Sequence, residues 1–352
     1  MSTSLNSHAY VCIMAGGSGE RFWPISRPTT PKHLLKLFSD RTLIEETVRR
    51  TEGVVPPENI FVLTNEVQVV AMREALPFMK PEQIIAEPAK RDTAPAAALA
   101  TGYVKARDPE GVLALLPADA LIKDAETFAR QLQQALEVAS KGESLLTFAI
   151  KPTHPATGFG YLEMAETRDD GLRRVARFVE KPDSPTAEEY LASGNYGWNA
   201  GIFLWNVAAF EREAESNAPE LVKFIRDFPA GDCTAYLAER FSTLPKISVD
   251  YAIMEKASSV ATMVAEFDWD DVGSWAALPA HMEQDEQGNT TKGKVVAHES
   301  SNNIAISSGR VIALCGVKDL VVVETADSIM VCHRDAVQDI KKLMADLPPE
   351  VK

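Results

Sequence analysis

A glycine-rich turn near the start of the chain is the first stretch whose residue types could do chemistry. An apolar run, residues 10–14, leads directly into Ala15-Gly16-Gly17-Ser18-Gly19, and Arg21 and Lys32 follow. Because glycine has no Cβ, the backbone of such a turn can approach a ligand closely and point its N–H groups at phosphate oxygens. The stretch therefore predicts a nucleotide phosphate site. Phe22 stands where a dinucleotide fingerprint needs its third glycine, and the Gly-Lys-Ser/Thr of a P-loop is missing, so both of those loops are excluded.

Two carboxylates that are far apart in the sequence could hold one divalent cation. Asp119 follows the most apolar strand-like run, 112–116, and Asp271 lies in an acidic segment flanked by aromatic residues, 267–275. Mg²⁺ commonly takes one or two carboxylates and completes its shell with substrate phosphates and water. We expect Asp119 and Asp271 to bind Mg²⁺ together from opposite sides of a cleft, although a single aspartate at a turn is often only solvated.

Residues after another strand-like run, 83–86, could recognise a nucleoside. The carboxylate of Glu87 could accept hydrogen bonds from both the N1–H and the amino group of a guanine. Thr93 opens an alanine-rich helix, where it could contact the base or ribose or could simply cap the helix. The predicted nucleotide-binding residues are Ala15, Gly16, Gly17, Ser18, Gly19, Glu87 and Thr93.

A further group of residues could bind a sugar phosphate. Glu180 and Asn199 flank strand-like runs and carry groups suited to sugar hydroxyls. Lys181 can meet a phosphate as a compact point charge, and Gly160 could allow close approach. Each of these residues, taken alone, is more often an ordinary turn or strand-end residue.

The elements that must position these residues alternate along the first two thirds of the chain. Strand-like apolar runs occupy 60–63, 83–86, 112–116 and 145–150, and helical patterns occupy 66–76, 94–105 and 125–140. This alternation predicts an α/β fold with a mostly parallel sheet and helices on both faces. Ligands in such folds bind at the carboxyl ends of the strands, so the glycine turn, Glu87 and Asp119 should share one rim.

The pattern changes from about residue 281. A polar segment, 284–289, precedes short apolar runs at 294–297, 303–307, 310–315, 319–324 and 328–332, and an amphipathic helix follows at 334–346. The regular spacing favours a small β module of β-helix type. We expect a catalytic domain over 1–280 and this module with its terminal helix over 290–352. The module could serve dimerisation or could cover one end of the larger domain.

Composition narrows the classes of partner. The chain has 352 residues and a net charge of −14, which argues against nucleic acid and anionic membrane surfaces but not against phosphorylated substrates, because cations can cluster locally. Four scattered cysteines show neither metal-ligand spacing nor a disulfide framework. Neither a signal peptide nor a membrane-spanning run is visible, so we expect a cytoplasmic protein.

Together these segments resemble the sugar nucleotidyltransferases, and within them the mannose-1-phosphate guanylyltransferase family. The resemblance covers nearly the whole chain and is most specific at 16–24, 31–32, 91–95, 248–256 and 271–275. It implies a Rossmann-like catalytic domain, a C-terminal β-helical module and Mg²⁺-dependent transfer of GMP from GTP to mannose 1-phosphate. The residues expected to carry that reaction are Arg21, Lys32, Lys181, Asp119 and Asp271.

Two departures from the family pattern leave alternatives open. Ala120 stands where the family usually has a histidine, and His33-Leu34 replaces the usual Gln-Phe after Lys32. One alternative is a related nucleotidyltransferase that uses another hexose 1-phosphate or another nucleoside triphosphate. The other is a catalytically quiet regulatory paralogue that binds a nucleotide sugar.

Overall fold

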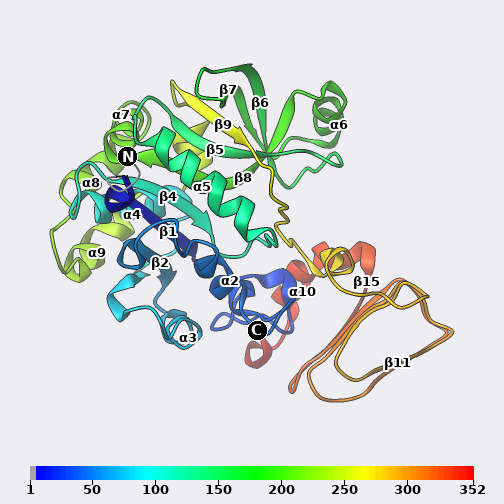
Figure 1. Ribbon diagram of the computed structural model, residues 1–352. Coiled ribbons are helices and arrows are strands. Elements are labelled where there is room, and N and C mark those ends of the chain that lie inside the picture. The colour runs from blue at the N-terminus through cyan, green and yellow to red at the C-terminus, as the bar shows by residue number, and fades with distance from the viewer. Residues whose placement is uncertain (1–4) are drawn as a thin grey trace.

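A nine-stranded mixed sheet forms the centre of the protein, in the order β3-β2-β1-β4-β8-β5-β9-β7-β6. The computed structural model describes the backbone of residues 5–352 (Figure 1). Pairing is parallel through β3-β2-β1-β4 and between β5 and β9, and it is antiparallel elsewhere. The strands are β1 (Ala9–Ala15), β2 (Ile60–Asn65), β3 (Ile84–Glu87), β4 (Val112–Pro117), β5 (Leu145–Ile150), β6 (Gly160–Thr167), β7 (Arg173–Glu180), β8 (Tyr196–Asn206) and β9 (Val260–Val264).

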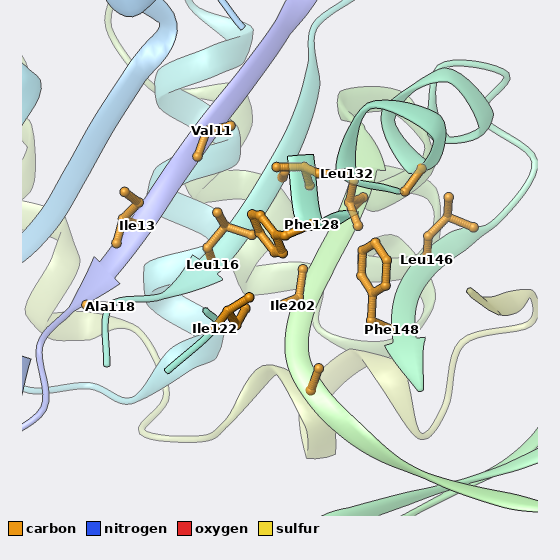
Figure 2. Packing of buried hydrophobic residues seen from close by; sticks show 14 of the residues in the cluster. Val11, Ile13, Leu116, Ala118, Ile122, Phe128, Leu132, Leu146, Phe148 and Ile202 are labelled. Atoms are coloured by element: carbon orange, nitrogen blue, oxygen red, sulfur yellow. The ribbon is translucent and has the colours of Figure 1, made fainter. Parts of the chain in front are cut away.

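Helices cover both faces of this sheet, as predicted. Alternate residues of a strand point to opposite faces, so Val11 and Ile13 of β1 join the cluster under α2, α3 and α5, whereas Tyr10 and Cys12 join the cluster under α4, α7, α8 and α9. Figure 2 shows the first cluster between β1, β4, β8, β5 and α5. The helices are α1 (Leu5–His8), α2 (Leu43–Arg49), α3 (Val69–Ala75), α4 (Thr93–Lys105), α5 (Ala125–Ala139), α6 (Ser184–Ser193), α7 (Val207–Asn217), α8 (Pro219–Arg226), α9 (Thr234–Arg240) and α10 (Ile340–Asp346).

The C-terminal residues form a separate module in which strands from successive turns of the chain stack on one another. One sheet has the order β10-β12-β14-β15 and a second pairs β11 with β13, and all pairs except β14–β15 are parallel, as in a β-helix. The α/β class and the β-helix-like module are thus confirmed, whereas the domain limits 1–280 and 290–352 remain predictions. The strands are β10 (Thr290–Lys292), β11 (Val295–His298), β12 (Ile304–Ser307), β13 (Ile312–Cys315), β14 (Leu320–Glu324) and β15 (Ile329–His333).

A third apolar cluster joins the module to the segment that follows β1. Phe22 and Trp23, directly after the glycine turn, are buried together with Trp275, Val321 and Val323. In Figure 1 the red C-terminal segment lies against the blue segment after β1. The β-helical module therefore packs beside the glycine turn and supports it. Within residues 5–352, no helix is long and apolar enough to cross a membrane.

Candidate active site

Residues predicted to hold phosphates and a cation line one cavity at the carboxyl ends of β1 and β4. Its walls include Arg21, Lys32, Asp119 and Asp271, together with Ser18 and Gly19 of the turn. The backbone N–H of Ala118, after β4, donates to the Met14 carbonyl of β1 at 3.1 Å. The glycine turn and the Asp119 loop thus share one rim, as the parallel-sheet prediction requires.

Gly19 is the position in the turn where only glycine fits. Its φ is 61°, in the left-handed region, and a Cβ there would lie 2.5 Å from the Lys32 backbone nitrogen. Its carbonyl accepts from the Ser26 hydroxyl at 2.8 Å. This close approach places Lys32 directly against the turn.

A short backbone bridge brings the two distant aspartates together. Leu121 N–H donates to the Asp270 carbonyl at 2.8 Å, and Asp270 N–H donates back to the Leu121 carbonyl at 3.0 Å. Arg50, which is buried, donates to the Ala120 carbonyl at 3.1 Å and so also fixes the loop that carries Asp119. Because each bridging residue lies within two positions of Asp119 or Asp271, the bridge sets the spacing of those side chains.

The three aspartates of the acidic segment have different roles. Asp268 accepts from the backbone N–H groups of Lys123 and Asp124, at 3.0 and 2.7 Å. Asp270 accepts from the backbone of Val272 at 2.6 Å and lies 2.7 Å from the His281 ring. No residue between 5 and 352 forms a hydrogen bond with the Asp271 carboxylate in the structure. Asp268 and Asp270 therefore fold the segment, and Asp271 is left available for a ligand.

The residue that follows Asp271 is held in an unusual conformation. Val272 is fully buried and has a φ of 44°, which is rare for a β-branched side chain. Such a backbone persists only where its surroundings hold it, and it costs about 1–3 kcal/mol. Its burial in the third cluster turns the chain sharply beside Asp271.

Lys32 lies between the two carboxylate loops. Its side chain is buried, and Nζ lies 3.0 Å from Asp119 Oδ2 while it also donates to the Asp271 main-chain carbonyl. Burial would raise the pKa of Asp119, but the charge and hydrogen bond of Lys32 hold that pKa below its usual value. Burial raises the pKa of Asp271; the charge of Lys32 opposes this increase, and the charges of Asp270 and Asp119 add to it. The charges of the two carboxylates therefore repel each other, and an added cation would reduce this repulsion.

This donor set fits a hard divalent cation. Both candidate ligands are carboxylates, and residues 5–352 contain no cluster of three or more metal-ligating side chains of the His, Cys, Asp and Glu types. A cation with two protein oxygens and the rest of its shell from substrate and water is the arrangement expected for Mg²⁺. His33 is not a catalytic base here, because burial lowers its pKa to about 4 and its Nε2 has no partner among the described residues.

A second cavity continues from the glycine turn towards β3 and α4. Gly16, Gly17, Glu87 and Thr93 line it together, and their binding of a nucleoside stays a prediction. Burial raises the pKa of Glu87 to about 8. The Thr93 hydroxyl accepts from the Val249 backbone at 2.9 Å, so part of its hydrogen-bonding capacity holds the helix start in place. The cap of α4 is Asp92, whose side chain accepts from Thr93 N–H.

A third and wider cavity adjoins the first, with which it shares Arg21 and Asp271, and it contains Lys181. Lys181 forms an ion pair with Glu180. A Cβ on Gly160 would lie 2.5 Å from Glu180 Oε2. The missing side chain at Gly160 thus leaves room for the carboxylate of Glu180, and a contact of Gly160 with a sugar stays a prediction.

Asn199 is part of a buried polar chain behind Lys181. Its Oδ1 accepts from the Thr147 hydroxyl at 2.8 Å, and its Nδ2 donates to Asp250 at 3.1 Å. Burial and the nearby Glu180 charge raise the pKa of Asp250 to about 7. Asp250 was not among the predicted site residues, although it lies in the distinctive segment 248–256. A lone aspartate in that segment carries no sign of its burial beside Glu180.

Comparisons with known proteins agree with this geometry. Residues 10–288 match the nucleotidyl transferase family, and residues 293–347 match the MannoseP isomerase/GMP-like beta-helix domain. The chain is 36% identical to the alginate biosynthesis protein AlgA of Pseudomonas aeruginosa over 95% of this chain and 71% of that protein. It is also 36% identical to the mannose-1-phosphate guanylyltransferase of Escherichia coli K12, over 97% and 74% of the two chains.

A solved structure is similar over almost its whole length. The crystal structure named "mannose-1-phosphate geranyltransferase", from Thermus thermophilus, superposes with a TM-score of 0.88 at 34% identity, covering 96% of this chain and 99% of that one. Both the α/β part and the β-helical module are included in matches of this extent. The chain therefore belongs to the nucleotidyl transferase family and is similar to members named mannose-1-phosphate guanylyltransferase.

Proposed function

We propose that the protein transfers GMP from GTP to α-D-mannose 1-phosphate, giving GDP-mannose and pyrophosphate. The observation that carries this proposal is the meeting of Asp119 and Asp271 beside Lys32, in a cavity formed by the glycine turn. The second cavity, lined by the glycine turn, supplies room for a nucleoside, and the third, which shares Arg21 and Asp271 with the first, supplies room for a sugar phosphate. The names of the relatives support GTP and mannose 1-phosphate as the substrates.

The reaction needs little acid–base chemistry from the protein. A phosphate monoester has a second pKa near ~6, so the attacking oxygen of the sugar phosphate is already ionised at neutral pH. That oxygen forms a bond to the α-phosphorus of GTP while the bond from this phosphorus to the bridging oxygen breaks and pyrophosphate leaves. The obstacle is repulsion between anions, which positioning and fixed positive charges reduce.

We assign the charges as follows. Arg21 and Lys32 hold the β- and γ-phosphates, and Lys181 holds the attacking phosphate. Asp119 and Asp271 are the residues that would hold Mg²⁺, whose positive charge offsets the repulsion between the phosphates when it is bound. Each of these five side chains lines one of the two adjoining cavities, which share Arg21 and Asp271.

Selectivity is assigned to Glu87 in the second cavity and to Glu180, the ion-pair partner of Lys181. The ionised form of Glu87 presents two acceptor oxygens, which match the two donors of guanine N1–H and its amino group. Glu180 is proposed to accept from sugar hydroxyls, with Asn199 and Asp250 behind it keeping the polar chain in place. Thr93 contributes to the nucleoside site mainly by holding the start of α4.

The test is a grid of nucleoside triphosphates against hexose 1-phosphates, with pyrophosphate release measured with and without Mg²⁺. We expect the highest kcat/KM for GTP with mannose 1-phosphate and no turnover after chelation. A preference for another pair would replace the proposed substrates, and ligand binding without turnover of any pair would refute the proposal.

One variant tests the cation ligand directly. Asp271→Asn should lower kcat by about 10³-fold or more, because it removes a charge from the reacting centre. The unfolding temperature should not fall, since this carboxylate makes no hydrogen bond within residues 5–352 and its burial disfavours the charged form. Asp169→Asn, an exposed aspartate on another part of the surface, is the matched control. Activity of Asp271→Asn within a few-fold of that of the control, at saturating Mg²⁺, would overturn the assignment.

A further inference from the structure

The cavity assigned to the triphosphate has one wall that comes from the other end of the chain. Lys341, on α10, lines it together with Arg21 and Lys32. The same view that shows the module shows the C-terminal segment among the residues that follow β1 (Figure 1). A basic side chain of the β-helical module thus lies at the predicted phosphate site.

The position of α10 is held by packing on its inner side. Ile340, the neighbour of Lys341, is 2% exposed and belongs to the third cluster with Phe22 and Trp23. Farther along the same segment, the Val351 carbonyl accepts from Trp23 Nε1 at 2.7 Å. Because these contacts attach α10 to the residues directly after the glycine turn, the distance between Lys341 and the turn is fixed by the fold.

The present partner of Lys341 holds it only loosely. Its Nζ lies 3.8 Å from Glu20 Oε2, and its side chain is 68% exposed. Glu20 also accepts from the Ser18 hydroxyl at 3.1 Å through its other oxygen. An exposed ion pair at this distance contributes little in water, so the ammonium group is free to turn towards a stronger anion.

The charges that line the cavity leave room for a further cation beside a bound triphosphate. Lys32 is already paired with Asp119, and Glu20 adds a further negative charge to the lining. Among the other cations that line this cavity, Arg21 is the one whose charge a carboxylate neutralises least, because its guanidinium donates to the Gly273 main-chain carbonyl. Because Lys32 shares its charge with Asp119, a triphosphate end with several negative charges would gain from a further cation beside Arg21 and Lys32.

We propose that Lys341 is a phosphate-binding residue that contacts the β- and γ-phosphates of the nucleotide, so that the β-helical module completes the pyrophosphate site. This rests on the proposed function, because it assumes that the triphosphate occupies this cavity. On binding, Nζ leaves Glu20 and donates to phosphate oxygens.

The next residue supplies a matched control. Lys342 has a side chain that is 83% exposed, and it pairs with Asp339 of its own segment. We would measure the binding of inorganic pyrophosphate, GTP and GMP by calorimetry in Mg²⁺ buffer, using the whole chain with Lys341→Ala, Lys341→Arg or Lys342→Ala. Lys341→Ala should weaken pyrophosphate and GTP about tenfold, a typical scale for one charge-assisted contact to phosphate that is partly open to solvent.

The other arms separate direct contact from indirect effects. GMP has no β- or γ-phosphate, so its affinity should stay within about twofold for every variant, and Lys341→Arg should regain most of the loss because it keeps the charge. Equal effects of Lys341→Ala and Lys342→Ala would overturn the proposal. So would an equal loss of GMP binding, or full recovery when Glu20→Gln is added to Lys341→Ala, since Lys341 would then act only by neutralising Glu20.

The pyrophosphate arm keeps the two proposals distinguishable. A wild-type protein that binds pyrophosphate through Lys341 but turns over no substrate pair would refute the proposed reaction and support the phosphate contact. A wild-type protein that makes GDP-mannose while Lys341→Ala binds pyrophosphate and GTP normally would do the opposite.

Discussion

Replacing Gly19 by alanine tests whether the glycine turn and Lys32 depend on each other. The φ of 61° at Gly19 lies in a region where an L-residue costs about 1–2 kcal/mol. The added Cβ would also lie 2.5 Å from the Lys32 nitrogen and 2.6 Å from the Lys32 Cβ, so these atoms must separate. Relief of such crowding in a packed region costs about 1–3 kcal/mol more.

The total for Gly19→Ala is therefore about 2–5 kcal/mol, shared between a less stable fold and a displaced Lys32. We expect a lower unfolding temperature, a weaker affinity for GTP and a kcat/KM reduced by at least about 10²-fold, since misplacing a charged group by an ångström can cost that much. Calorimetry, thermal unfolding and pyrophosphate release would measure these three quantities on the same preparation.

Gly17 gives the matched control for stability. A Cβ on Gly17 meets no atom within 4 Å, and its φ lies outside the left-handed range. Gly17→Ala should therefore unfold at the wild-type temperature, whatever it does to the ligand. If Gly19→Ala matched Gly17→Ala in stability and bound GTP within about twofold of the wild type, the reasoning about the contact with Lys32 would be refuted.

Two further predictions concern carboxyl groups that are shielded from water. The pKa of Asp250 is raised to about 7, so the folded state binds its proton more tightly than the unfolded state and stability is lost as pH rises from about 4 to about 7. Asp250→Asn removes this loss, so its free energy of unfolding should gain on the wild type by on the order of 2–4 kcal/mol between about pH 4 and pH 8, and parallel pH profiles of stability would contradict this. The pKa of Glu87 is raised to about 8, and guanine donors favour its ionised form, so GTP affinity should increase from about pH 6.5 to 8.5 by up to about tenfold per unit. Glu87→Gln should bind GTP more weakly and lose this increase in a calorimetric titration, and an unchanged pH profile in the variant would contradict the assignment.

Much of the sheet could be predicted because its central strands are buried on both faces. The runs 112–116 and 145–150 are almost wholly apolar, and they became β4 and β5. In contrast, β7 (Arg173–Glu180) is mostly exposed or half-buried, and its sequence mixes arginine with apolar residues. Its antiparallel pairing with β6, including shifts of register, depends on neighbours that no local pattern specifies.

The candidate site could be predicted as a set of residue types but not as a set of contacts. Among the three aspartates, Asp271 was expected to be the cation ligand. The physical reason appears only in the structure, where the carboxylates of Asp268 and Asp270 already accept hydrogen bonds from backbone N–H groups. The carboxylate of Glu180 lies where a side chain at position 160 would be, a contact that no sequence pattern showed. Such distinctions depend on which groups tertiary packing brings within hydrogen-bonding distance.

The apolar cluster that contains both Phe22 and Val323 means that the two modules share one interior. A substitution in the β-helix that removes a methyl group at Val323 loosens a cluster that also contains Phe22, the neighbour of Arg21. The position of the phosphate-binding residues therefore depends on side chains roughly three hundred positions downstream. Neither the catalytic domain nor the β-helical module can change its packing in this cluster without affecting the other.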